Sequence, residues 1–136
     1  MIVVVDSGVW VSSFQFGGTP LAALRHAYKR HQIAICDQIL LEPHSVLLTK
    51  FGWSTSRIES AIADYLDNTI VLATPGRIGR ICRDPNDDMV FECAILTQAG
   101  VILTGDKDLL AIGEYEGIRI LTPRAFLDEF AAQADN

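Results

Sequence analysis

Acidic residues gather at four places along the chain, and grouped carboxylates can bind hard metal ions. The four places are Asp6, Glu42, the segment 84–88, and the pair Asp106 and Asp108. Oxygen ligands without accompanying histidine or cysteine favour Mg²⁺ or Mn²⁺. One or two such ions can activate a water molecule and stabilise the leaving oxygen in phosphodiester hydrolysis. If the fold brings these acids together, the chemistry they indicate is metal-dependent hydrolysis.

Each of these acids also has a purely structural interpretation. An aspartate that follows a strand often caps the next helix. Asp84 has the form of such a cap, and the helix dipole favours Asp87 in the first turn. Asp88 precedes Glu92 by four residues, a mildly unfavourable like-charge spacing on a helix that a nearby metal would relieve. Glu42, within an otherwise apolar run, fits a metal ligand and a solvated surface acid equally well.

Short apolar runs alternate with helical segments, which predicts an α/β domain with three α/β/α layers and a mainly parallel central sheet of about five strands. The expected strands are 2–5, 33–36, 70–73, 101–103 and 118–121. The expected helices are 7–16, 20–30 capped by Thr19, 39–49 capped by Asp37, 55–66, 86–98 and 123–132. Parallel sheets bind ligands at the carboxyl ends of their strands. Asp6 and Asp106 follow two strands, so we expect both at one rim.

Length and composition predict a single domain over residues 1–132 with a frayed tail at 133–136. The chain has 136 residues, of which 49% are hydrophobic, enough for one core. Its apolar runs are too short for a membrane span, and no signal peptide is apparent, so we expect a cytoplasmic protein with no membrane partner. Cys36, Cys82 and Cys93 are far apart, which favours buried free thiols over disulfides or a zinc site.

The balance of charge argues against passive binding of nucleic acid. Seventeen acids face eleven Lys and Arg, a formal charge of −6, whereas phosphate affinity normally needs a cationic surface. Bound metal ions would supply positive charge locally. The one compact basic group, Arg77, Arg80 and Arg83, is either a phosphate-tracking patch or a solvated loop. Trp10 and Trp53 fit core or interface packing better than stacking on bases.

Four motifs occur in order across residues 2 to about 123. They are the strand ending in Asp6-Ser7, Glu42 followed by VL at 46–47 and KFG at 50–52, DPNDD at 84–88 followed by Phe91, Glu92 and Ala94, and TGDKDLL at 104–110. Together they resemble the PIN-domain ribonucleases, most closely the VapC-like toxin components of bacterial and archaeal toxin–antitoxin systems.

The resemblance implies an endoribonuclease that uses Mg²⁺ or Mn²⁺ to hydrolyse RNA, forms a homodimer and is silenced by a small antitoxin protein. The family's catalytic and metal-binding acids carry over to Asp6, Glu42, Asp88 and Asp106, with Asp108 as a further metal ligand. Asp88 is preferred to Asp87 because its spacing to Ala94 and Asp106 matches the family. Weaker assignments, as residues that orient the ligands or contact substrate, are Ser7, Thr104, Asp87, Glu92, Arg77, Arg80 and Arg83.

One departure from the family keeps other functions open. Gly8 stands where the family usually has asparagine. A catalytically degenerate PIN domain that only binds RNA or protein is therefore the main alternative. A haloacid-dehalogenase-like phosphatase would also begin with an aspartate after a strand, but it needs a second aspartate at position 8.

Overall fold

A computed structural model describes residues 1–73 and 85–131, with only the backbone course for residues 85–88. Its centre is one sheet in the order β3-β2-β1-β4-β6-β5. The strands are β1 (Ile2–Val5), β2 (Gln32–Cys36), β3 (Thr69–Leu72), β4 (Val101–Leu103), β5 (Glu114–Tyr115) and β6 (Ile118–Leu121). All neighbouring strands are parallel except β5, which pairs antiparallel with β6.

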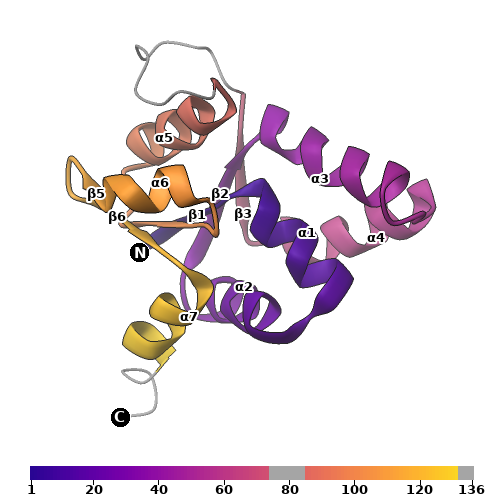
Figure 1. Cartoon of the computed structure of the whole chain (residues 1–136), viewed down its shortest axis with the longest axis horizontal. Helices are drawn as coiled ribbons and strands as arrows, with labels where there is room; N and C mark the ends of the chain where they lie inside the picture. Colours follow the sequence, from indigo (N-terminus) through magenta and orange to yellow (C-terminus); the bar gives the residue numbers. More distant parts are fainter. Residues whose placement is uncertain (74–84, 132–136) are drawn as a thin grey trace.

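Helices cover both faces of this sheet (Figure 1). They are α1 (Ser7–Phe16), α2 (Gly18–Arg30), α3 (Asp37–Thr49), α4 (Thr55–Leu66), α5 (Pro85–Thr97), α6 (Lys107–Ile112) and α7 (Pro123–Phe126), which continues as the π-helix Leu127–Ala131. Helix α5 packs on β1, β2 and β4, while α1 and α7 both pack on α2. Right-handed crossovers place α5 and α2 on opposite faces, because the chain reverses its direction across the sheet after β3. The three-layer α/β/α prediction is therefore confirmed.

The core has a main cluster around the sheet and a smaller second cluster beneath α4. Val3, Val4 and Val5 of β1 are fully buried, as their unbroken apolar run predicts. The second cluster consists of Leu47, Trp53 and Ile58, from α3, the following loop and α4. Trp10 lies in the main cluster, so both tryptophans pack in the interior rather than presenting their rings to solvent.

Two of the three cysteines lie in the described part of the chain, and both are buried free thiols, as predicted. Burial, with smaller contributions from Cys36 and Glu92, raises the pKa of Cys93 to about 12. Cys82 lies outside the described residues. None of the described helices combines the length and apolarity needed to cross a membrane.

The five predicted strands are confirmed to within one residue, but two short elements were not predicted. Strand β5 has two residues and α6 has six, both too short to produce a periodic apolar pattern. The C-terminal helix was predicted as one element, whereas its hydrogen bonding changes to the π form at Leu127.

Two predicted helix caps were wrong. Helix α2 begins at Gly18, so Thr19 lies inside it, and Gly17 occupies the cap position with a φ of 71° that favours glycine. Helix α3 begins at Asp37 itself, after Cys36, which makes no capping hydrogen bond through its side chain. The Asp37 carboxylate accepts a hydrogen bond from the backbone of Gln38 instead. The predicted cap at Asp84 lies outside the described residues.

Candidate active site

The candidate site lies where the order of the strands reverses, between β1 and β4. In parallel α/β sheets this is the place where ligands bind. Val5 pairs with Leu103 at the carboxyl ends of the two strands. The backbone N–H of Asp6 then donates a hydrogen bond to the carbonyl of Leu103, at 3.0 Å. The register therefore sets Asp6 and Thr104, the next residues, side by side at the rim.

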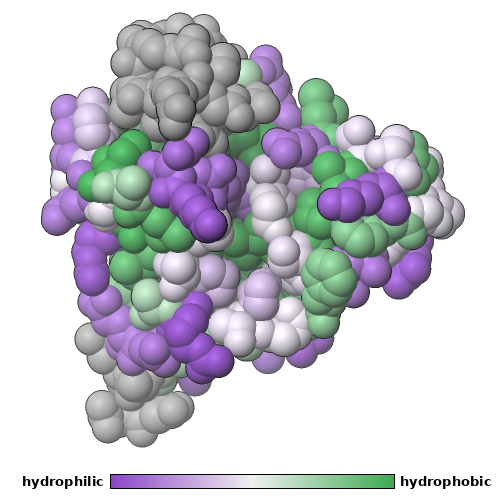
Figure 2. Space-filling model, viewed as in Figure 1, coloured by the Kyte–Doolittle hydropathy of each residue, from purple (hydrophilic) through white to green (hydrophobic). Residues whose placement is uncertain are grey.

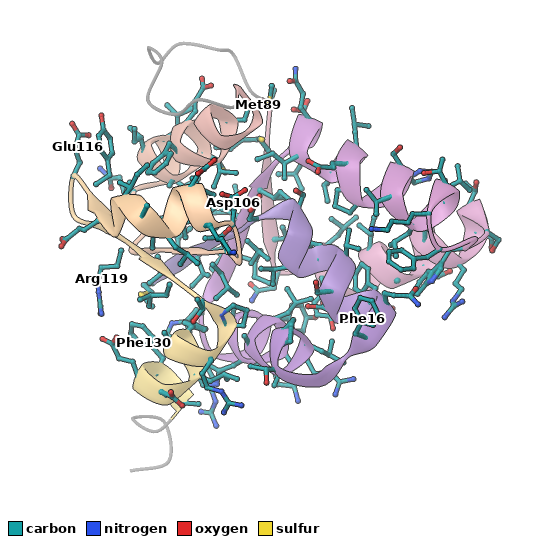
Figure 3. All side chains as sticks on the ribbon, viewed as in Figure 1. Phe16, Met89, Asp106, Glu116, Arg119 and Phe130 are labelled. Atoms are coloured by element: carbon teal, nitrogen blue, oxygen red, sulfur yellow. The ribbon has the colours of Figure 1, made fainter. Side chains whose placement is uncertain are left out.

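A pocket of about 770 Å³ opens at this rim. Its lining comes from the start of α1, most of the length of α3, the β4–α6 turn, Pro20 of α2 and Pro123 at the start of α7. Three carboxylates line it, those of Asp6, Glu42 and Asp106. Figure 3 shows Asp106 in the middle of the molecule, between α6 and the start of α1. In Figure 2, viewed from the same side, hydrophilic and apolar residues lie next to one another across this region.

A hydrogen-bond network joins the three residues that carry these carboxylates. Thr104 donates from Oγ1 to Asp6 Oδ2 at 2.8 Å, and accepts from the backbone N–H of Asp106 at 3.0 Å. The backbone N–H of Ser7 donates to Asp6 Oδ1 at 2.8 Å. The Ser7 hydroxyl donates to Glu42 Oε2 at 3.1 Å. The two hydroxyl residues thus fix Asp6 and connect it to the other two acids.

The surroundings of Asp6 make its negative charge unfavourable. Burial raises the pKa of Asp6, and the negative charges of Asp106 and Glu42 raise it further. The hydrogen bonds from Thr104 and Ser7 oppose this shift because they favour the charged carboxylate. A carboxylate that is firmly hydrogen-bonded yet short of positive charge gains stability from a proton or a cation.

Asp6 and Asp106 also act as helix caps, so the structural interpretation of both is correct. Asp6 is the N-cap of α1. Asp106 is the N-cap of α6, and its Oδ1 accepts hydrogen bonds from the backbone of Asp108 and Leu109, at 2.8 and 3.2 Å. A cap uses one carboxylate oxygen and holds the group at the helix start. In this fold that position is also the rim of the pocket, so capping and site formation coincide.

The donors in the pocket fit a hard divalent cation by their chemistry and charge. They are carboxylate and hydroxyl oxygens, the ligands that Mg²⁺ and Mn²⁺ prefer. Among the described residues, however, no group of three or more His, Cys, Asp or Glu lies close enough to enclose an ion. Asp88, the fourth predicted acid, is not covered by this statement. Only its backbone is described, in the first turn of α5.

The structure separates the predicted site residues into three groups. The pocket is lined by Asp6, Ser7, Glu42 and Asp106, and the buried Thr104 donates a hydrogen bond to Asp6. Asp108 is exposed on α6, and Glu92 is 2% exposed within α5; neither is among the described residues that line the pocket. The other predictions concern side chains outside the described part, those of Arg77, Arg80, Arg83, Asp87 and Asp88.

Three polar residues of the pocket were missed in the sequence. They are Ser12 of α1, and Gln38 and Ser45 of α3. The helical spacing held the signal, since Ser12 lies four residues after Gly8 and Ser45 three residues after Glu42. Residues three and four apart share a helix face, so a residue placed at the pocket indicates which others accompany it.

The fold and the site together define an α/β domain with acidic residues at the point where the strand order reverses. The chain belongs to the PIN domain family, whose sequence model matches residues 2–108. Gly8 stands where the resemblance implies an asparagine, and a Cβ added at this position meets no atom within 4 Å. The family membership also removes the grounds for a haloacid-dehalogenase-like phosphatase.

Similar proteins are found both by sequence and by structure. An uncharacterized protein of Methanocaldococcus jannaschii, MJ1680, is 24% identical over 94% of this chain and 90% of its own length. The crystal structure of VapBC2 from Rickettsia felis, bound to a promoter DNA fragment, superposes with a TM-score of 0.64 at 15% identity, covering 90% of this chain and 98% of that one. VapC20 of Mycobacterium tuberculosis, a toxin that cleaves the sarcin-ricin loop, gives a TM-score of 0.63 at 17% identity, over 86% and 98% of the chains.

Proposed function

We propose that this protein is a metal-dependent endoribonuclease and the toxin of a toxin–antitoxin pair. The observation that carries the proposal is the linked set of acids, in which Asp6 is tied through Thr104 and Ser7 to Asp106 and Glu42 in one open pocket. The family membership and the likeness to VapBC2 and VapC20 support the same function. The homodimer, the cytoplasmic location and the small antitoxin partner belong to this proposal.

Asp6, Glu42 and Asp106 would hold Mg²⁺ or Mn²⁺, together with Asp88 at the start of α5. One or two ions bound there would supply an activated water and neutralise charge on the leaving oxygen of the RNA backbone. Thr104 and Ser7 hold the Asp6 carboxylate in a fixed orientation and favour its ionised form, because both donate hydrogen bonds to its oxygens. Asp108, on the exposed start of α6, is a weaker candidate for the same cation.

Activity on RNA tests this proposal. Purified protein is incubated with a panel of structured RNAs in Mg²⁺, Mn²⁺ or EDTA, in parallel with an Asp6→Asn variant made in the same way. We expect cleavage that requires the metal and is lost in the variant, whose asparagine can still accept the hydrogen bond of the cap. The parallel preparation controls for contaminating ribonuclease.

A lack of cleavage by folded, antitoxin-free protein in every metal would refute the enzyme. The degenerate binding module would then be the better account, and Gly8 offers its direct test. Since a Cβ added at Gly8 meets no atom within 4 Å and Gly8 lines the open pocket, Gly8→Asn should fold normally. Appearance of cleavage only in Gly8→Asn would identify the missing asparagine as the cause.

A further inference from the structure

A second feature lies at the opposite end of α1 from the pocket. We call it the outer tip, formed by Phe16, Lys50, Phe51, Trp53 and Arg57 from the end of α1, the loop after α3 and the first turn of α4. Phe16 is 72% exposed, the highest value among the large hydrophobic residues described. Figure 3 shows it at the end of α1 farther from Asp106. An exposed aromatic ring offers a face on which a nucleic-acid base can stack.

The rings of the outer tip are held in place by the second core cluster. Trp53 is nearly buried, and its indole N–H donates to Gln15 Oε1 at 2.8 Å. Phe51 packs beside the same cluster and meets Phe16 at right angles, with ring centroids 5.8 Å apart. The exposed ring of Phe16 is therefore held in place by its neighbour. A ligand that stacks on this ring loses little conformational entropy in ordering it.

Positive charge accompanies these rings. The Arg57 guanidinium lies 3.6 Å from the centroid of the Trp53 ring, and Lys50 Nζ lies 5.6 Å from that of Phe51. The stretch from residue 50 to residue 57 contains no acid. Ser54 caps the N-terminus of α4 beside it, where the helix dipole adds further positive potential.

The pocket itself lacks such charge. Its described lining holds three carboxylates and no lysine or arginine, and the whole chain carries −6. Among the described residues, cationic contacts for an RNA strand must come from outside the pocket, because phosphate contacts dominate the affinity for nucleic acids. Exposed aromatic rings flanked by cations are the features that bind single strands, by stacking on bases and tracking the backbone.

The distance between the two regions suits a short stretch of RNA. Helix α1 starts at Ser7 in the pocket and ends at Phe16, which at 1.5 Å per residue separates them by about 14 Å. Helix α3 runs the same way, from the residues around Glu42 towards Lys50. Both helices thus lead from the acids to the outer tip.

We propose that the outer tip is a docking platform for single-stranded RNA, which stacks a base on Phe16 and contacts phosphates through Lys50 and Arg57 while the strand enters the pocket. This inference rests on the proposed ribonuclease function and specifies its substrate as RNA unpaired beyond the cleavage point. An amphipathic protein segment is the competing occupant, and the two cations of the stretch from residue 50 to residue 57, which contains no acid, favour RNA.

Binding of a fluorescently labelled pool of random-sequence single-stranded RNA tests the platform, measured in EDTA so that no strand is cut. We expect Phe16→Ala to weaken binding about tenfold with an unchanged salt dependence, since it removes stacking alone. Lys50→Gln and Arg57→Gln should each reduce the slope of log affinity against log salt by about 0.7, the loss of one phosphate contact. Matched controls are Leu96→Ala and Lys29→Gln, exposed residues on α5 and α2, which should change neither quantity.

The outcomes separate this inference from the proposed function. If the wild type cleaves RNA with Mg²⁺ or Mn²⁺ while all three tip variants bind RNA like the wild type, the platform is refuted and the ribonuclease stands. If the tip variants still bind RNA but no longer bind a protein partner, the platform is also refuted and the outer tip is a protein-docking surface. If the wild type neither binds nor cleaves RNA, the proposed function fails and the platform with it. Thermal unfolding of each variant verifies that the comparison is between folded proteins.

Discussion

The two ends of helix α1 differ in what holds them together. At the inner end, Asp6 is fixed by hydrogen bonds, and nearby acids raise its pKa. At the outer end, Phe14 contacts Trp53 and the second core cluster through apolar surface, without charge conflict. The same helix therefore joins a region under electrostatic strain to one stabilised by ordinary burial.

This difference indicates that function is located at the inner end of α1 and that the outer end contributes mainly to stability. Burial of apolar side chains stabilises the fold without regard to chemistry, whereas carboxylates crowded near one another destabilise it unless they serve a ligand. Sites of function are the places where such local costs are expected. The comparison predicts that changes at the inner end alter activity and leave folding intact, and that changes in the outer core do the reverse.

The largest expected effect is on catalysis at the inner end. Asp106→Asn should reduce RNA cleavage about a hundredfold or more, the loss typical of removing one charge-stabilising group. Because asparagine caps helices as well as aspartate does, the variant should unfold at nearly the wild-type temperature. Asp106→Ala should lose the same activity and in addition about 1 kcal/mol of stability. Equal stability of the two variants would mean that the cap on α6 contributes nothing.

A substitution in the outer core should have the opposite profile. Leu47 is fully buried in the second cluster, so Leu47→Ala should lower the free energy of unfolding by about 3 kcal/mol through the cavity that it leaves. Urea denaturation measures this loss. Cleavage per folded molecule at saturating RNA, assayed well below the melting temperature, should stay near the wild-type rate, and a large fall would show that the two ends are not independent.

The strands and the rim could be predicted from the sequence, because their signals are local. Three valines followed by Asp6 indicate a buried strand and the site residue after it. Thr104 could be predicted only as a rim hydroxyl. Its bond to Asp6 joins residues 98 positions apart, and the register that creates it depends on how β1 and β4 pair. The start of α2 was misplaced because a glycine in an unusual conformation, Gly17, precedes it, where Thr19 matched the usual cap pattern.

Removal of the Thr104 hydroxyl, which donates to Asp6, should have an intermediate effect on cleavage. Thr104→Val keeps the shape of the side chain but removes its hydrogen bond to Asp6, and we expect cleavage to fall about tenfold, since hydrogen bonds to charged groups are worth about 1.5–3 kcal/mol. Thr104→Ser should restore most of the rate. If serine and valine were equally impaired, the loss would come from altered packing and not from orientation of the carboxylate.

The smallest expected effect is on the pH dependence of stability in EDTA. The folded protein raises the pKa of Asp6 above its ordinary value of 3.8, so it binds more protons than the unfolded chain between these two pKa values. Stability should therefore fall as the pH rises from about 4 through the raised pKa of Asp6. Melting temperatures of wild type and Asp6→Asn, measured across this range, should show the fall attributable to Asp6 only in the wild type.

Binding of Mn²⁺ in the absence of RNA tests the central claim most directly, because it does not depend on knowing the substrate. Titration followed by the electron paramagnetic resonance of free Mn²⁺ gives the affinity of the wild type, of Asp6→Asn at the inner end and of Phe16→Ala at the outer tip. We predict that Asp6→Asn weakens Mn²⁺ binding by at least about tenfold, since it removes a proposed charged ligand, and that Phe16→Ala binds like the wild type. Equal affinity in the wild type and Asp6→Asn would contradict the assignment of the acidic pocket as the metal site.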